Sequence, residues 1–177
     1  EATERFAYQA MHDHLTGLPN RRAFDKALEE AVSASRRASD RCVLCYIDLD
    51  FFKAVNDIGG HAAGDALLRE VAGLIQQELR AGDLISRIGG DEFALLLHDC
   101  STDDGWRIAE SLCRAISVLD FRWEDRVFTV SASFGLAEID ASVESCAAVM
   151  KIADDACYAA KRHGRNRVML HGACSPA

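Results

Sequence analysis

A glycine-centred hairpin in the middle of the chain is the feature that most constrains the fold. Residues 87–97 read RIGGDEFALLL, so two glycines and two acids stand between an apolar approach and an apolar run. The apolar segments at 84–88 and 92–98 predict two strands. Gly89 and Gly90 predict a tight turn between them, because glycine enters positive φ without steric cost. We therefore expect an antiparallel pair of strands within the sheet.

The rest of the chain alternates between helical and extended patterns. Apolar residues at helical spacing predict helices at about 21–37, 65–80, 103–117 and 143–162. Extended patterns predict a fully buried strand at 42–49, a half-buried strand at 128–136 and a final strand at 166–170. A short polar turn ending at Gly59 and Gly60 is expected between the first strand and the second helix. One antiparallel hairpin in this order predicts an α+β fold, with helices packed on a mostly antiparallel sheet.

The composition is that of one globular domain. The 177 residues are enough for a sizeable core, and no apolar run approaches the roughly 20 residues of a membrane span. A net charge of −8 argues against a general nucleic-acid binder. The seven cysteines are odd in number and scattered, which predicts reduced thiols in the core and a cytoplasmic location. Cys42 and Cys45 form a CxxC, but without a second pair the sequence does not predict a zinc site.

The two ends of the chain differ from its middle. A helical pattern at 4–14 has no start signal, and the chain begins at Glu1. Residues 1–14 therefore predict the last part of a connector helix from an upstream signalling domain. This expectation is compatible with a membrane anchor in the parent protein. Residues 15–171 form the expected domain, which needs no membrane contact of its own, and 172–177 are expected to be a tail.

Acidic residues follow the first strand and the glycine turn. Asp48 and Asp50 end the strand at 42–49, and Asp91 and Glu92 follow the glycines. If that strand pairs beside the hairpin, Asp48 and Asp91 converge at one edge of the sheet. Carboxylates there suit Mg²⁺, which prefers oxygen ligands and keeps waters or phosphates in its shell. Each acid alone is more often a helix cap or a solvated turn residue, and only their clustering favours a metal site.

Three cations have positions that suit a phosphate. Lys53 follows Asp50 on the turn that leaves the strand, where its ammonium could reach a metal-bound phosphate. Lys161 and Arg165 are spaced i,i+4 near a helix end, so that they face the same way. The competing interpretation is a solvated surface charge for Lys53 and simple complementation of the helix dipole for the other two.

Polar residues near the second helix suit a purine. Guanine offers N1–H and N2–H₂ to a carboxylate such as Asp65, and the amide of Asn56 can satisfy neighbouring acceptors. Taken singly, Asn56 is an ordinary turn residue and Asp65 an ordinary N-cap. His61 and His163 lie in glycine-rich loops, where a histidine is more often a hydrogen-bonding turn residue than a metal ligand.

Five sequence blocks occur in a familiar order. They are DHLTGLPNRRAF, DLDFFKAVND with GHAAGD, RIGGDEF, SFGLA and ADDACYAAKRHGRNRV. On these blocks, which cover nearly the whole chain, the sequence resembles the GGDEF family, the catalytic domain of diguanylate cyclases. The resemblance implies a palm-like α+β fold, similar to nucleotidyl cyclases and ferredoxin-like domains. It also implies condensation of two GTP into cyclic di-GMP, with release of two pyrophosphates, at the interface of a symmetric homodimer.

The resemblance implies a role for each candidate residue. Mg²⁺, with Mn²⁺ as a substitute, would be held by Asp48, the Leu49 carbonyl, Asp91 and Glu92. The catalytic set would be Asp91, Glu92 and Lys53, with Glu92 as a second metal ligand or a base. The GTP-binding set would be Phe52 through its backbone, Asn56, His61, Asp65, Lys161 and Arg165.

A further block, RAGD at 80–83, resembles the inhibitory product site of the family. It implies that Arg80 and Asp83 bind cyclic di-GMP, with Arg87 as a further candidate and Arg114 as another cation to consider. The chain departs from the family pattern at Gly59, where an aromatic residue is usual. This departure predicts a looser guanine loop.

Other functions remain open. A regulatory module that binds GTP or cyclic di-GMP without turnover would have damaged acids or no Lys53, and neither is seen. A cyclase with a mixed GMP–AMP product is disfavoured by Asp65, because a carboxylate meets the N1 acceptor of adenine unfavourably. An interaction domain with incidental acids is the least favoured interpretation.

Overall fold

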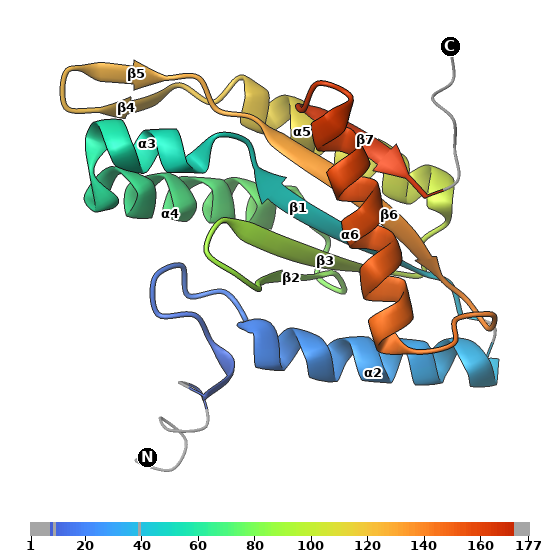
Figure 1. Cartoon of the computed structure of the whole chain (residues 1–177). Helices are drawn as coiled ribbons and strands as arrows, with labels where there is room; N and C mark the ends of the chain where they lie inside the picture. Colours follow the sequence, from blue (N-terminus) through green and yellow to red (C-terminus); the bar gives the residue numbers. More distant parts are fainter. Residues whose placement is uncertain (1–7, 9, 39, 172–177) are drawn as a thin grey trace.

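The computed structural model describes residues 8, 10–38 and 40–171, and its centre is a five-stranded sheet (Figure 1). The strands follow the order β2-β3-β1-β6-β7, where β1 is Cys42–Leu49, β2 Leu84–Arg87, β3 Glu92–His98, β6 Ala132–Ile139 and β7 Arg167–Leu170. All neighbouring pairs are antiparallel except β6 and β7, which run parallel. The predicted α+β fold with a mostly antiparallel sheet is therefore confirmed.

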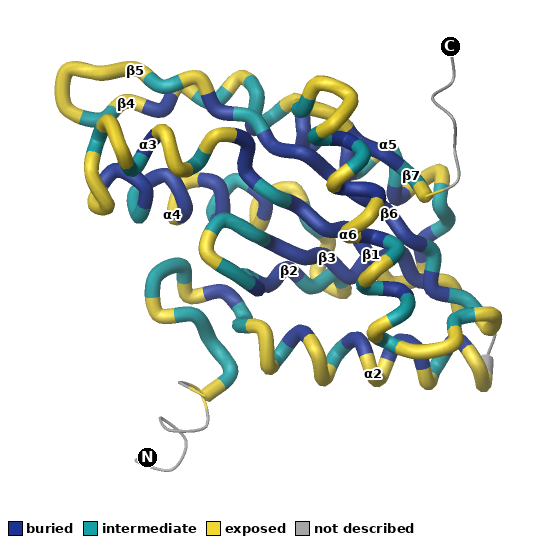
Figure 2. Tube along the Cα trace, in the orientation of Figure 1, coloured by how far each residue is buried: buried dark blue, intermediate teal, exposed yellow. Residues whose placement is uncertain are grey.

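Helices cover both faces of this sheet. They are α2 Arg21–Ala38, α3 Phe52–Gly59, α4 His61–Glu78, α5 Thr102–Ser117 and α6 Cys146–Arg162. One core cluster joins the sheet to α4 and α5, and a second joins its other face to α2 and α6. Figure 2 shows the result as strands that are buried along most of their length.

The strand predicted at 128–136 differs from β6 in two ways. Strand β6 is Ala132–Ile139, and all but one of its residues are buried, so it is not half-exposed as the alternation predicted. The reason is that α5 packs on one face of β6 and α6 on the other. Phe128 belongs instead to a separate hairpin of β4 (Phe121–Trp123) and β5 (Arg126–Phe128).

The polar turn predicted between the first strand and the second helix is wrong. This segment forms the helix α3, which packs beside α4 and meets it at Gly60, where φ is 82°. Eight residues are too few to reveal a helical period, so the segment looked like a turn. As a result, the second predicted helix also began too late, because α4 begins at His61.

The cysteines of the described residues lie in or beside the core. Five of the six are buried, and all six are free. Cys45 belongs to the core cluster under α4 and α5, whereas Cys42 belongs to the cluster under α2 and α6. The two sulfurs of the CxxC therefore face opposite sides of β1 and do not form a metal site together. Burial raises the pKa of Cys113 to about 11, as expected for an unreactive core thiol.

The ends of the chain are only partly described. Tyr8, Ala10 and Met11 are helical, but residues 12–14 are not, so the helix predicted at 4–14 extends too far at its end. Residues 4–7 and 9 of that prediction, and the tail at 172–177, lie outside the described residues. Within the described part of the chain, no helix is long and apolar enough to cross a membrane.

Candidate active site

The end of β1 and the start of β3 bring the predicted acids to one edge of the sheet. Asp48 is the register partner of Glu92, and Leu49 N donates to Asp91 O at 3.1 Å. This convergence follows from the antiparallel pairing that the hairpin predicted. Leu49 is 1% exposed, so its side chain is not available to a ligand.

The Asp48 carboxylate is electrostatically unusual. Its pKa rises from 3.8 to about 6, chiefly because it is buried and next because the charge of Asp91 lies close by. Lys161 Nζ lies 3.1 Å from Asp48 Oδ1 and partly counters this rise. Asp48 Oδ1 is buried and has no hydrogen-bond partner of good geometry. The Lys161 ammonium therefore acts on it as a nearby positive charge.

Gly89 has a different purpose from the one predicted. Neither Gly89 nor Gly90 adopts positive φ. Instead, the Glu92 carboxylate lies directly against Gly89, and a Cβ at that position would overlap it. The turn is closed by Ile88 N, which donates to Glu92 O at 3.0 Å. Glu92 also contacts the hydroxyl of Tyr46, whose pKa is raised by burial first and by this contact second.

These residues fit a divalent cation. Asp48 Oδ1 is a buried anionic oxygen without an aligned donor, and the carboxylates of Asp91 and Glu92 lie near it. In the described part of the chain, no group of three or more His, Cys, Asp and Glu side chains is arranged so that it could hold a metal ion by itself. Two or three carboxylates, with the remaining positions left to waters and phosphates, are the donor set that Mg²⁺ uses.

Asp50 does not join this cluster. It is 5% exposed and accepts hydrogen bonds from Ser131 Oγ and Ser133 Oγ, both at 2.7 Å. Asn166 N donates to it at 3.0 Å. Its carboxylate is therefore satisfied within the protein, where it ties the end of β1 to β6 and to the turn before β7.

The predicted cations lie on two elements beside the acids. Lys161 is in the last turn of α6, and Lys53 is exposed in the first turn of α3. Helix α6 crosses β6 closely at Gly135, where a Cβ would collide with backbone atoms of Ala153 and Cys157. Arg165, just beyond α6, stacks over the ring of Phe51, with 4.6 Å from its Cζ to the ring centroid.

The predicted guanine-reading residues lie on the paired helices α3 and α4. Asn56 and Asp65 are both half-buried, and His61 is exposed at the start of α4. The Asn56 side chain lies against Gly64, where a Cβ would overlap its carbonyl oxygen. The helix pair thus holds the amide beside the residue that precedes Asp65. Phe52 packs against the core and begins α3.

Gly59 does not loosen this region. It is the last residue of α3, and a Cβ there would lie 2.6 Å from Ala63 Cβ. The same Cβ would lie 3.4 Å from Phe128 and 3.5 Å from Trp123 of the β4–β5 hairpin. The space next to Gly59 is therefore filled by helix α4 and two aromatic rings, which corrects the predicted loose loop.

The candidate inhibitory residues divide into two groups. Arg80 and Asp83 form a two-point ion pair, with Nε–Oδ2 and Nη2–Oδ1 distances of 3.2 Å, and Arg80 also donates to His98 O at 3.1 Å. They lie at the far end of the β2–β3 ladder from Glu92. Arg87 lies at the near end of β2, so the structure does not bring it beside Arg80 and Asp83.

Arg87 instead joins the entrance loop (residues 13–19) to the β2–β3 hairpin. Its Nη1 lies 2.9 Å from Asp13 Oδ1, and its Nη2 donates to Gly90 O at 2.9 Å. Asp13 also accepts from Thr16 N and Thr16 Oγ1, which lowers its pKa against the opposing effect of burial. Sequence reasoning missed Asp13, although an Asp three residues before a Thr is a pattern of local side-chain-to-backbone turns.

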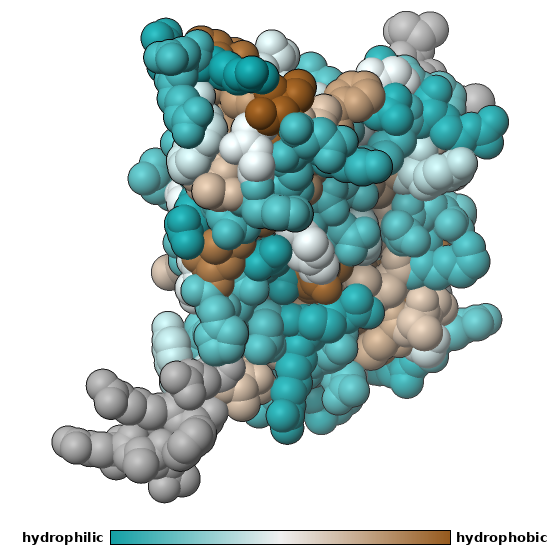
Figure 3. All heavy atoms as spheres, turned by 60° about the vertical axis from the view of Figure 1, so that its left-hand side comes forward, coloured by the Kyte–Doolittle hydropathy of each residue, from teal (hydrophilic) through white to brown (hydrophobic). Residues whose placement is uncertain are grey.

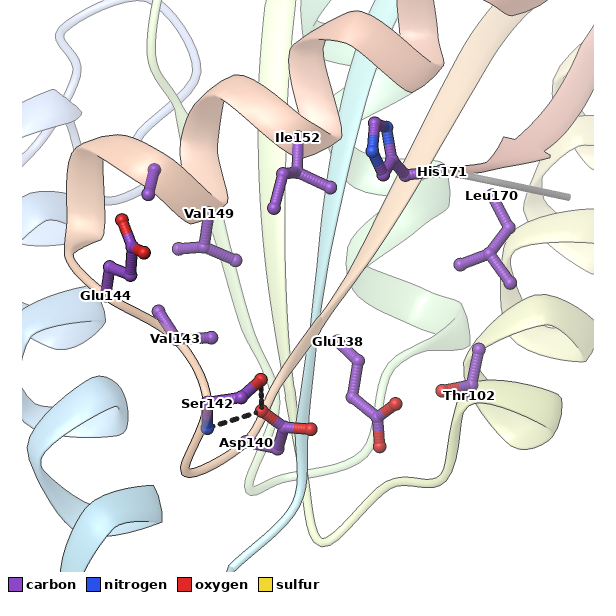
Figure 4. A pocket seen from close by; sticks show the side chains of 11 residues that line it. Thr102, Glu138, Asp140, Ser142, Val143, Glu144, Val149, Ile152, Leu170 and His171 are labelled. Carbon is purple, nitrogen blue, oxygen red and sulfur yellow. Dashed lines mark hydrogen bonds between the residues drawn. The ribbon is translucent and has the colours of Figure 1, made fainter.

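A concavity lies at the opposite end of β6 from Asp48 (Figure 4). It has a volume of about 480 Å³, with Val149, Ile152 and Leu170 on its apolar side and Glu138 on its polar side. Asp140 accepts a hydrogen bond from Ser142 N at 2.8 Å, so it serves its own turn. Ser133 is the β6 partner of Asp48, whereas Glu138 pairs near the other end of β1. The concavity is therefore separate from the acidic edge.

Arg114, a candidate cation for the inhibitory site, lines another concavity, of about 250 Å³, with Trp106 and Arg167.

Comparison with known families gives one clear match. The family described as "Diguanylate cyclase, GGDEF domain" matches residues 10–167. The "Probable diguanylate cyclase DgcE" of Escherichia coli (strain K12) is 47% identical over 94% of this chain, which corresponds to 15% of that protein. The diguanylate cyclase DgcP of Pseudomonas aeruginosa is 39% identical over 90% of this chain and 24% of its own length. The chain thus spans less than a quarter of either relative.

Solved structures agree with this match. The coiled coil and GGDEF domain of DgcB from Caulobacter crescentus, in complex with c-di-GMP, superposes with a TM-score of 0.90. The two chains are 32% identical, and the match covers 96% of this chain and 90% of DgcB. Another match is diguanylate cyclase SiaD from Pseudomonas aeruginosa, in complex with its activator SiaC, with a TM-score of 0.88 and 36% sequence identity. This match covers 96% of this chain and 65% of the SiaD chain.

Proposed function

The chain belongs to the GGDEF family of diguanylate cyclase domains, and from this premise we propose that it condenses two GTP into cyclic di-GMP with release of two pyrophosphates. The observation that carries the proposal is the acidic edge itself. Asp48 is half-buried beside Asp91 and Glu92, and this environment raises its pKa. One of its oxygens is buried and has no aligned donor. Such a group gains stability from a cation and from the phosphates that accompany it.

The acids would hold Mg²⁺ or Mn²⁺ through Asp48, the Leu49 carbonyl, Asp91 and Glu92. The ion would supply charge stabilisation at the phosphorus under attack and at the leaving pyrophosphate. Glu92 would accept the proton of the attacking 3′-hydroxyl. Its contacts with Gly89 and Tyr46 support this role, because they hold the carboxylate in one position.

Cations from two elements bind the triphosphate. Lys53 begins α3, next to the backbone of Phe52, and Lys161 brings positive charge to within 3.1 Å of Asp48. Arg165 follows Lys161 by four residues. Their role is to neutralise the phosphates and to hold the α-phosphorus in line with the incoming hydroxyl.

The paired helices α3 and α4 read the guanine. Asp65 accepts from N1–H and N2–H₂, while Asn56 satisfies a neighbouring acceptor and His61 lines the same loop. The contact between Asn56 and Gly64 supports this assignment, because it fixes the amide relative to α4. A base that lacks these donors would leave a half-buried carboxylate unpaired.

One domain holds one GTP, so the reaction needs two domains that face each other as a symmetric homodimer. Residues 15–171 would be the cyclase domain of a larger signalling protein, and residues 1–14 would end the connector that sets the geometry of the dimer. The ion pair between Asp13 and Arg87 supports this role, since it joins the entrance loop to the hairpin of Asp91. The domain would act in the cytoplasm, where GTP is present.

Product inhibition would occur through Arg80 and Asp83. The DgcB neighbour is described in complex with c-di-GMP, and the two residues here are already oriented as a planar pair. Cyclic di-GMP would replace the internal ion pair, with the guanidinium on phosphate or base and the carboxylate on a guanine edge. Arg87 would contribute only after releasing Asp13.

The decisive test is GTP turnover with Mg²⁺ at several protein concentrations, with nucleotides separated by chromatography. Cyclic di-GMP whose specific rate rises with protein concentration is the expected result. An Asp91→Asn variant serves as the inactive control, and a Glu70→Gln variant on the exposed side of α4 as the active one. GTP binding without product, even in an artificially dimerised protein, would identify a regulatory binding module instead.

A further inference from the structure

Two residues with left-handed backbone conformations meet beside the acidic edge. Phe51, which precedes α3, has φ 56° and ψ 28°, and Arg165, which follows α6, has φ 63°. Residues other than glycine enter this region at a cost in conformational energy. The Arg165 Cζ lies 4.6 Å from the centroid of the Phe51 ring, which is within the range of a cation–π interaction.

Packing in the core does not account for the Phe51 ring. Phe51 is 66% exposed. The face of the molecule in Figure 3 is mostly hydrophilic, with separate apolar patches. The first turn of α3 is closed by Ala54 N, which donates to Phe51 O at 2.9 Å and requires no particular side chain. The distinctive contact of the ring is therefore the guanidinium of Arg165.

The backbone around this contact is fixed independently. Asn166 N donates to Asp50 Oδ2 at 3.0 Å, and Arg165 N donates to Ala160 O at 3.0 Å. These bonds place the Arg165 backbone next to Phe51, but they leave its long side chain free to sample many rotamers. A flat aromatic face restricts a planar guanidinium to stacked orientations.

We propose that Phe51 is a positioning residue, whose ring holds the Arg165 guanidinium ready for the triphosphate of a bound nucleotide. Lys161, four residues before Arg165, already lies at Asp48. The Phe51 ring would therefore orient Arg165 as the second cation of the same phosphate subsite. Identification of the anion as a nucleotide triphosphate rests on the proposed function. The stacking and its effect on polyphosphate binding do not depend on turnover.

The test combines an aromatic series at residue 51 with a probe that lacks a base. Inorganic tripolyphosphate with Mg²⁺ is titrated into the wild type, Phe51→Leu and Phe51→Trp by calorimetry. Phe51→Leu keeps apolar bulk but loses the aromatic face, so binding should weaken about two- to five-fold, as for loss of an exposed cation–π contact. Phe51→Trp should bind as tightly as the wild type or more tightly. In an Arg165→Ala background, Phe51→Leu should have no further effect.

Two further measurements separate positioning from stability. In NMR spectra, the Arg165 side-chain Nε–H, assigned with Arg165→Lys, should have a ring-current shift that Phe51→Leu abolishes. Phe51→Gly relieves the left-handed strain, so its unfolding midpoint should not fall, yet its tripolyphosphate affinity should fall as in Phe51→Leu. In turnover, the KM for GTP should rise in both variants while kcat changes little.

Unchanged tripolyphosphate affinity in Phe51→Leu would overturn the proposal, as would effects of Phe51→Leu and Arg165→Ala that simply add. Absence of cyclic di-GMP synthesis, with the ring-current shift and tripolyphosphate results as expected, would instead overturn the proposed function and leave the positioning role standing.

Discussion

Asp48 and Asp50 lie two residues apart at the end of β1, yet their carboxylates have opposite environments. Asp50 accepts three hydrogen bonds, from two serine hydroxyls and one backbone N–H. Asp48 is half-buried beside other acids, with one ammonium nearby and one buried oxygen that has no aligned donor. The difference teaches how to separate a structural acid from a functional one. A carboxylate whose hydrogen bonds all come from the protein stabilises the fold, whereas a carboxylate that lacks such donors is available to bind a ligand.

The largest expected effect is on catalysis. Asp91→Asn should lower kcat by roughly 10³-fold or more, since it removes charge stabilisation from the acidic edge. The free energy of unfolding should stay the same or rise, because one source of repulsion on Asp48 is gone. Chromatographic assays and urea titrations measure the two quantities. An Asp91→Asn protein that is both active and destabilised would contradict the assignment of Asp91 to catalysis and Asp50 to stability.

The next effect is on stability. Asp50→Ala should lower the free energy of unfolding by about 2–5 kcal/mol, because a buried carboxylate and three hydrogen bonds to it are lost. Urea unfolding measures this change, with the exposed Glu70→Ala as the control, for which about 0.5 kcal/mol or less is expected. A loss for Asp50→Ala no larger than for this control would mean that its hydrogen bonds contribute little.

The pH dependence of stability should identify Asp48. Its folded-state pKa is raised to about 6 from 3.8, so the folded protein binds a proton that the unfolded chain releases over this interval. Stability should therefore fall as pH rises from about 4 to 6, by at most about 3 kcal/mol, and stay reduced above that. Asp48→Asn should remove this fall.

Added Mg²⁺ gives a second arm of the same experiment. It should raise the Tm of the wild type at pH 8, where Asp48 is ionised, and have little effect on Asp48→Asn. A fall with pH that persists unchanged in Asp48→Asn would assign it to another group.

A smaller effect is expected at the turn. Gly89→Ala places a methyl group where the Glu92 carboxylate lies, so Glu92 must move. We expect kcat to fall about ten-fold, that is about 1.4 kcal/mol in the barrier. Stability should change by less than in Asp50→Ala, because Asp50 and its donors are not touched. Gly90→Ala is the matched control, since nothing lies within 4 Å of its added carbon. Equal losses in the two variants would rule out the close approach as the reason for Gly89.

Local patterns predicted the parts of the fold that have strong periods. The buried strand β1, the hairpin of β2 and β3, and the long helices α2, α5 and α6 were all expected close to their observed bounds. Short elements were missed, because eight residues in α3 and three in each of β4 and β5 are too few to establish a period. The candidate acids were also found, since a strand that ends in carboxylates next to a hairpin has few ways to pair.

The sequence by itself determined the strand–turn–strand frame and the set of chemical groups at its edge. Apolar patterns and turn glycines are local signals that extend over only a few residues, so they can be recognised without the tertiary structure. Only the tertiary structure decided what each group does. Asp50 meets its serine donors on and just before β6, Arg87 meets Asp13, and Phe51 meets Arg165, all through pairing of distant segments. Whether a charge is satisfied depends on which partners the register and helix packing deliver, and no local pattern encodes those partners.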